Sequence, residues 1–162
     1  MSTSLDAIDL RILESLQEDA GRSTAEIAKR VGLSQSPCWR RIRRLEKAGV
    51  ILGRISVLDP RALGLEVTVF ASIKLSEHGT KALPEFEAAI EDLEEVVDAY
   101  AMTGEVDYVL RIITRNIERY ERFLRDELLQ LPTVREVHSQ IALKRIKHTT
   151  RLPLALLELR DA

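Results

Sequence analysis

The sequence predicts an α+β protein, in which an N-terminal winged helix-turn-helix domain is followed by a ferredoxin-like βαββαβ domain. The first fifty residues contain three short segments with helical spacing, and strand and helix patterns alternate through the rest. Pro60 and Gly64 interrupt the chain between these parts. The expected divisions are domains at 1–60 and 67–152, a hinge at 61–66 and a C-terminal tail at 153–162.

The composition limits the class of protein further. The chain has 162 residues, of which 45% are hydrophobic and 31% charged, so we expect a folded core rather than disorder. A single cysteine excludes an internal disulfide framework and a multi-cysteine metal site. The chain lacks both a run of roughly 18 apolar residues and the features of a signal peptide. We therefore expect a soluble, cytoplasmic protein.

Three helices are expected in the N-terminal domain. Asp6 is suited to cap the first helix, and Ser23 with Glu26 forms a capping box at the start of the second. Gly32 ends the second helix, and the third runs from Ser34 to Ala48. Two helices joined by a tight turn that contains glycine form a helix-turn-helix, which we place at about 24–43.

The third helix has two different faces. Its apolar stripe consists of Cys38, Ile42 and Leu45. A second stripe, roughly opposite, consists of Arg40, Arg43, Arg44 and Lys47, and no acids at matching spacing neutralise it. A partner that carries phosphates would relieve this repulsion, and arginine also suits bidentate contacts with guanine.

We therefore predict that the third helix contacts DNA, with a merely solvated basic face as the alternative. The net charge of −2 favours local reading of DNA over general binding. A strand or hairpin in 50–60 would form the wing. The predicted DNA-binding residues are Ser34, Gln35, Ser36, Arg40, Arg43, Arg44, Lys47 and Arg54.

Cys38 and Trp39 each allow two interpretations. Basic neighbours at a helix N-terminus can activate a thiol, but the place of Cys38 on the apolar stripe favours a buried core cysteine. Trp39 lies between the two stripes and fits either packing under the helix or contact with the DNA backbone.

The second half alternates strands and helices. Strands are expected at 66–75, 96–102, 107–114 and 134–146, and amphipathic helices at 83–93 and 117–128. The acidic segment 84–98, with seven acids and no base, is then a solvated helix face. Two helices cover one face of such a sheet. Apolar residues on the other face, namely Phe70, Tyr100, Met102 and Leu110, predict a dimer with facing sheets, which the apolar segment 152–159 would join.

Motifs of enzymes are missing from the sequence. It contains no G-x-S-x-G, P-loop, G-x-G-x-x-G or H-E-x-x-H motif, and His78, His138 and His148 lack metal-ligand spacing. We expect no catalytic residue, metal or cofactor. The turn around Gly104 instead carries polar residues whose amides and carboxylates match the two charged ends of a free amino acid, although an ordinary polar turn is the alternative.

The chain resembles the Lrp/AsnC family of feast-famine transcription regulators. The resemblance is carried by LDAIDLRILESLQEDAGRS, by the run LS-x-x-PC-x-x-R-x-RRLE, by MTGEVDYVLRI and by SQIALKRIKHTTRLPL. It implies dimers that assemble further, often to octamers, and amino-acid effectors bound between dimers. The effector-binding residues that it implies are Tyr100, Met102, Thr103, Gly104, Asp107 and Ser139. The family usually has Asp at Glu105 and often Thr at Ser139.

The expected function is therefore sequence-specific, DNA-binding regulation of transcription in amino-acid metabolism, modulated by a small amino acid at an oligomer interface. The expected partners are double-stranded DNA, the effector and further copies of the chain. Two alternatives remain at this point. One is an enzyme resembling the related sirohaem decarboxylases, and the other is an architectural protein that wraps DNA.

Overall fold

The computed structural model describes residues 4–76 and 82–157. Its contacts divide the chain into two compact units, Met1–Val57 with Lys147–Ala162 and Leu58–Ile146. Each unit has its own hydrophobic core. None of the described helices combines the length and the apolar character that crossing a bilayer requires.

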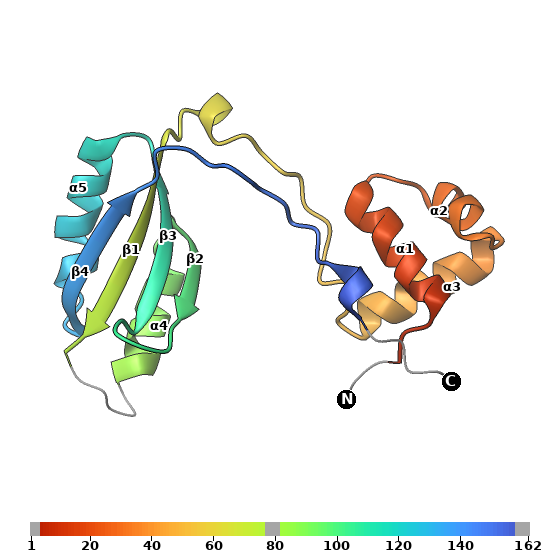
Figure 1. Cartoon of the computed structure of the whole chain (residues 1–162), viewed down its shortest axis with the longest axis horizontal. Helices are drawn as coiled ribbons and strands as arrows, with labels where there is room; N and C mark the ends of the chain where they lie inside the picture. The colour runs from red at the N-terminus through yellow and green to blue at the C-terminus, as the bar shows by residue number, and fades with distance from the viewer. Residues whose placement is uncertain (1–3, 77–81, 158–162) are drawn as a thin grey trace. The chain divides into compact units, whose positions relative to one another are not determined.

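The first unit is built on three helices, α1 (Ala7–Glu18), α2 (Thr24–Val31) and α3 (Gln35–Lys47) (Figure 1). The predicted caps are confirmed. Asp6 accepts hydrogen bonds from the amides of Ile8 and Asp9, and Ser23 and Glu26 form a reciprocal capping box. Gly32 ends α2 with φ 73°, a left-handed conformation that glycine adopts without steric cost.

The predicted strand or hairpin between residues 50 and 60 is wrong. Residues 52–59 form no strand in the described chain, and their apolar side chains are open to solvent, with Leu52 96% and Ile55 77% exposed. β-branched residues favour a strand only where a second strand offers its backbone groups. Within one copy, no described strand lies beside this segment.

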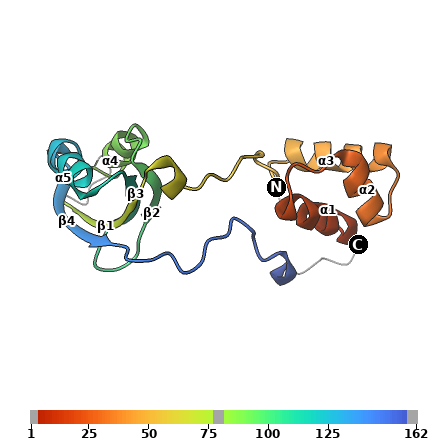
Figure 2. The same cartoon turned by 90° about the horizontal axis from the view of Figure 1, so that it is seen from above.

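The second unit has the predicted βαββαβ order. Its elements are β1 (Val67–Leu75), α4 (Ala82–Glu91), β2 (Val96–Ala101), β3 (Tyr108–Thr114), α5 (Ile117–Asp126) and β4 (Val134–Ile141). The sheet order is β2-β3-β1-β4, and every neighbouring pair is antiparallel. Figure 2 shows α4 and α5 on the same side of the sheet. Short 3-10 turns lie at Arg61–Leu63 (η1), Leu128–Gln130 (η2) and Leu154–Leu156 (η3).

The two faces of the sheet differ in burial. Val69, Ala71 and Ile73 point to the helices and are fully buried, whereas Phe70 is 42% exposed on the opposite face. The prediction that Leu110 shares that open face is wrong. β3 pairs Leu110 with Ala71, so Leu110 points toward the helices, and it is fully buried. Phe70 and Tyr100 remain on the open face.

The last strand is shorter than predicted, and within one copy the start of the tail contacts the helical unit. β4 ends at Ile141, which pairs with Val69 near the start of β1, and one further backbone hydrogen bond joins the amide of Ala142 to the carbonyl of Thr68. Further along, Leu154 packs against the core of the first unit, and the backbone of Leu152 exchanges two hydrogen bonds with the side chain of Gln17. Within one copy, Leu152 and Leu154 of the apolar tail thus contact the helical unit, while Glu158 and Leu159 lie outside the described residues.

Candidate functional site

The α3 helix presents one buried and one open face, as its two stripes predict. Cys38 and Leu45 are fully buried in the core of the helical unit, while Arg40 and Lys47 are exposed. At the start of the helix, Ser34 occupies the N-cap position, but within the described structure its side chain makes no cap hydrogen bond. The exposed side chains of Ser34, Gln35 and Ser36 therefore surround the N-terminal end of α3.

A buried carboxylate neutralises part of the basic stripe, contrary to the sequence-based expectation. Asp9 of α1 is fully buried and accepts a hydrogen bond from Nη1 of Arg41 at 2.9 Å. It also pairs with Arg44 and accepts the backbone amide of Asp6 at 3.1 Å. The neutralising acid lies on another helix, so the spacing of charges along α3 alone does not indicate it.

A second acid, Glu46, compensates the outer part of the stripe. The expectation that no acid at matching spacing neutralises this stripe is therefore wrong, because Glu46 lies three residues after Arg43 on the same helix. Its two carboxylate oxygens lie 3.1 Å from Arg43 and 3.8 Å from Arg54. The guanidinium of Arg43 also stacks 5.6 Å from the centre of the Trp39 ring, and Trp39 is 51% exposed. Arg43 and Trp39 thus form a solvent-facing cation-π pair.

Arg40 and Lys47 differ from these arginines. In the described part of the chain, neither side chain takes part in an ion pair. Arg40 lines a surface hollow of about 370 Å³ together with Pro37, Arg41 and Arg44. An exposed cation beside a concave, positively charged surface can bind a phosphate of a nucleic-acid backbone.

Cys38 is a core residue. It is fully buried between the helices, and burial raises the pKa of its thiol. A neutral thiol is a poor nucleophile, which favours the packing interpretation over a sensing one.

The turn between β2 and β3 brings together five of the six predicted effector residues. Tyr100 is 60% and Met102 46% exposed, and Thr103 and Gly104 are also exposed. Gly104 has φ 119°, which side-chain-bearing residues rarely adopt. Asp107 ties this turn to β1, because its carboxylate accepts the amide of Leu75 at 2.8 Å and its own amide donates to Ile73 at 2.9 Å.

Ser139 does not join the other five within one copy. It lies on β4 at one edge of the sheet, pairs with Ala71 and hydrogen-bonds the hydroxyl of Tyr120 on the helix-covered face. Tyr100 lies on β2 at the other edge and points to the open face. Tyr108, which follows the β2–β3 turn as the first residue of β3, points inward and is buried.

Tyr108 is a buried link between the sheet and α4. Its hydroxyl donates to Glu87 at 2.8 Å. Burial, reinforced by the negative charge of Glu87, raises the pKa of Tyr108 to about 12. The Tyr108 hydroxyl therefore stays protonated at neutral pH and serves the fold.

The histidines show no metal site in residues 4–76 and 82–157, where no group of three or more potential ligands gathers. His138 lies 3.5 Å from Glu136, His148 is exposed, and His78 lies outside the described residues.

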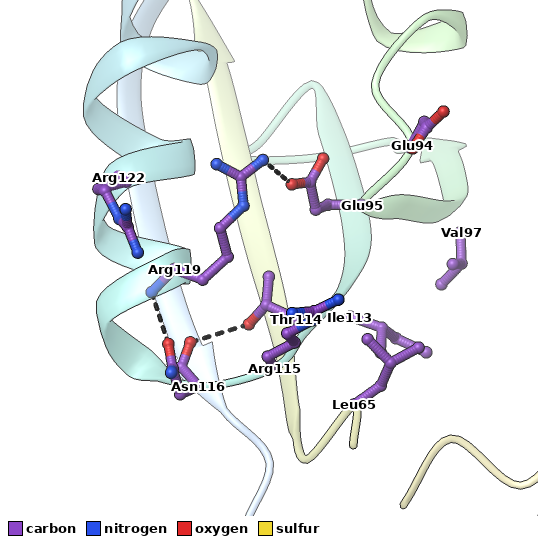
Figure 3. A pocket seen from close by; sticks show the side chains of 10 residues that line it. All are labelled: Leu65, Glu94, Glu95, Val97, Ile113, Thr114, Arg115, Asn116, Arg119 and Arg122. Carbon is purple, nitrogen blue, oxygen red and sulfur yellow. Dashed lines mark hydrogen bonds and ion pairs between the residues drawn. The ribbon is translucent and has the colours of Figure 1, made fainter. Parts of the chain in front are cut away.

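A further cavity escaped the sequence analysis. It has a volume of about 600 Å³ and lies where β2 begins and β3 ends, at the opposite end of these strands from the β2–β3 turn (Figure 3). Its apolar lining comes from Leu65, Val97 and Ile113. The spacing of Arg115, Arg119 and Arg122 is the one sequence signal for its charged side.

Comparisons with known proteins agree with this architecture. Residues 5–51 match the family model for a winged helix-turn-helix DNA-binding domain, and residues 68–152 match that for the Lrp/AsnC ligand binding domain. The chain is 38% identical over 154 residues to a glutamate uptake regulatory protein of Zymomonas mobilis, covering 95% of this chain and 93% of that protein.

Solved structures show the same similarity. An AsnC family transcriptional regulator from Agrobacterium tumefaciens is 42% identical with a TM-score of 0.89, covering 94% of this chain and 100% of that one. A transcriptional regulator from Neisseria meningitidis, solved as a complex with L-Met, is 36% identical with a TM-score of 0.89, covering 94% and 99%. With a DNA-binding helix-turn-helix and a ligand-binding domain that together span most of its length, the chain belongs to the Lrp/AsnC family of transcription regulators.

Proposed function

We propose that this regulator reads a specific DNA sequence through the N-terminal end and the outward face of α3. The observation that carries the proposal is that α3 has two different faces. Its apolar stripe is buried, whereas the side chains of Arg40 and Lys47 and the serine-rich N-terminal end are exposed to solvent. In helix-turn-helix proteins the corresponding end enters the major groove. Exposed cations on the same face would hold the phosphate backbone.

The structure divides the predicted DNA-binding residues into two roles. Ser34, Gln35, Ser36, Arg40, Arg43 and Lys47 lie on the open side of α3, and we propose them as contacts. Arg44 is bound to the buried Asp9, so we propose that it positions the helix instead. Arg54 keeps a loose pair with Glu46, which a nearby phosphate would replace.

We propose that two copies act together. The open sheet face carries Phe70 and Tyr100, and the connecting segment exposes Leu52 and Ile55. Such apolar surface favours association with a second copy. A dimer presents two α3 helices, and half-sites about 34–36 Å apart would suit them.

For the effector, we propose a small amino acid at the β2–β3 turn. The backbone amides of the exposed residues around Gly104 suit its carboxylate, and Glu105 or Asp107 suits its ammonium. Ser139 lies at the other edge of the sheet, so its participation requires a second copy. The L-Met complex of the Neisseria meningitidis relative supports this class of ligand.

The regulator interpretation is favoured over the two alternatives. The open basic helix face, together with relatives named as transcriptional regulators, supports DNA reading rather than sirohaem decarboxylation. The net charge of −2 favours local reading over wrapping. We therefore propose that the chain acts as a regulator in the cytoplasm and not as an enzyme.

The test of this function is selection of binding sites from a random duplex pool by the full chain. We expect enrichment of a site with two-fold related halves, which footprinting of the enriched duplex would show as two protected major-groove segments. A pool without a shared sequence after repeated rounds would refute sequence-specific reading and favour the architectural alternative.

A further inference from the structure

The cavity of about 600 Å³ at the start of α5 has the dimensions of a small-molecule site. Pockets for small ligands span roughly 300–1,000 Å³ and combine apolar walls with a few converging polar groups. This cavity is formed by the segment before β1, the start of β2, the end of β3 and the first turns of α5. Figure 3 shows the apolar residues Leu65, Val97 and Ile113 on one side and the arginines of α5 on the other.

The three arginines that line the cavity differ in whether they form ion pairs. Arg119 already pairs with Glu95, and it lies 3.3 Å from Glu127. Arg122 lies 3.8 Å from Glu118 on its own helix. Arg115 takes part in no ion pair within the described chain, and Figure 3 shows it between the apolar residues and α5. One cation of the cavity, Arg115, is thus available for an anionic group, and Figure 3 shows Glu94, the other acid of the lining besides Glu95, at a distance from Arg115.

The helix start reinforces this positive character. Asn116 caps α5 by accepting the amide of Arg119 at 2.8 Å. The remaining amides of the first turn, together with the helix dipole, favour a negative charge near this end. The hydroxyl of Thr114 is already used, since it donates to the carbonyl of Asn116 at 3.1 Å. A carboxylate beside Arg115 would therefore meet donors, while its body would face Leu65, Val97 and Ile113.

We propose that this cavity binds a small carboxylate with an aliphatic body, of the kind found in an apolar amino acid or its 2-oxo acid. The site is separate from the β2–β3 turn, because the two lie at opposite ends of β2 and β3. The guanidinium of Arg115 holds the carboxylate, and Leu65, Val97 and Ile113 cover the aliphatic chain.

Binding of a ligand in this cavity would also affect the segment that connects the two units. Leu65 lies two residues after the end of η1, and its amide donates to the carbonyl of Pro60 at 2.8 Å. A ligand packed against Leu65 therefore favours one conformation of the segment that leads from the DNA-binding unit. This regulatory consequence rests on the proposed function, whereas binding itself does not.

The test is calorimetric titration of the full chain with L-leucine and, separately, with 4-methyl-2-oxopentanoate. These probes share a carboxylate and a carbon skeleton and differ in the ammonium group, so they distinguish an amino acid from an oxo acid. Each is titrated into wild type, Arg115→Gln and the control Arg125→Gln. Arg125 lies on α5, the helix that begins just after Arg115, but it pairs with Glu121 and Asp126 and does not line the cavity.

We expect at least one probe to bind wild type and Arg125→Gln with the same Kd within twofold, and Arg115→Gln to raise that Kd at least tenfold. Repeating the titrations in an Asp107→Asn background separates this binding from the turn, and the dependence on Arg115 should persist there. Equal Kd values for wild type and Arg115→Gln, or no binding of either probe, would overturn the proposal. Failure of the chain to bind DNA would refute the proposed function and leave this result unchanged.

Discussion

Asp9 of α1 lies fully buried with its Oδ1 2.9 Å from Nη1 of Arg41 on α3. The same carboxylate pairs with Arg44, so one acid on α1 binds two arginines of α3, the proposed DNA-reading helix. It also completes the capping box of α1 through the amide of Asp6. The start of α1 and the orientation of α3 therefore depend on one side chain.

Replacement of this acid should destabilise the helical unit. Asp9→Asn removes the charge that two arginines share, and loss of charged hydrogen bonds should lower the free energy of unfolding by about 2 kcal/mol. Urea unfolding followed by circular dichroism measures the change. Glu14→Gln removes the same charge from an exposed position of α1 and serves as the control. Equal midpoints for the two variants would show that the buried pairs contribute nothing.

The two proposed classes of arginine can be separated. Arg44→Ala removes a positioning contact to Asp9 and should lower the free energy of unfolding by about 1–2 kcal/mol. Because Arg44 is not proposed to touch phosphate, the dependence of DNA affinity on salt should keep its wild-type slope. Filter binding over a salt series checks this. If Arg44→Ala reduces the slope of DNA affinity against salt as much as Arg40→Ala does, Arg44 contacts phosphate and the positioning role is refuted.

The β2–β3 turn requires glycine at its sharpest position. Gly104→Ala forces a side chain into φ 119° and should cost about 1–3 kcal/mol in the unfolding of the second unit. Gly53→Ala is the matched control, because Gly53 has ordinary backbone geometry and open space around it. If both alanine variants unfold at the same urea concentration, the strain assigned to Gly104 is absent.

The tail of the chain should be held by Gln17. Its amide accepts the backbone N–H of Leu152 at 2.6 Å and donates to the Leu152 carbonyl at 3.3 Å. In Gln17→Ala, we expect hydrogen exchange at the Leu152 amide to accelerate about fivefold, because the net value of a hydrogen bond is of order 1 kcal/mol. Gln130→Ala removes a comparable amide contact in the other unit and should leave this rate unchanged. Equal exchange rates in both variants would contradict the docking.

The raised pKa of the buried Tyr108 should make the stability of the protein depend on pH in the alkaline range. Its pKa is raised from 10.0 to about 12, so the protonated hydroxyl stabilises the fold fully below pH 10, and this contribution is lost as the pH rises toward 12. Tyr108→Phe should therefore show a shallower loss of stability between these pH values. Urea unfolding at several alkaline pH values measures it, and identical slopes for both proteins would refute the assignment.

Local patterns in the sequence were sufficient for most of the fold. The caps at Asp6 and Ser23 and the alternation along β1 depend on neighbouring residues, and all are confirmed. Relations between distant segments were not predictable in this way. The pair of Asp9 with Arg44 joins two helices, and the face of Leu110 depends on the register of β3 against β1.

The candidate sites likewise differ in whether they depend on neighbouring residues or on distant segments. The open face of α3 follows from spacing within one helix, so the sequence indicates it. The cavity beside Arg115 is assembled from segments between Leu65 and Arg122 that only the fold brings together. Likewise, the separation of Tyr100 from Ser139 follows from the order of strands in the sheet, which spacing alone does not reveal.

The most direct test of DNA reading by α3 is the salt dependence of duplex affinity for wild type and for the double variant Arg40→Ala/Lys47→Ala. Each neutralised phosphate contributes about 0.9 to the slope of log K against log salt, so we expect a slope about 1.8 smaller in the variant. The urea midpoint should not change, because both side chains are exposed. An unchanged slope at unchanged stability would show that this helix face does not contact DNA.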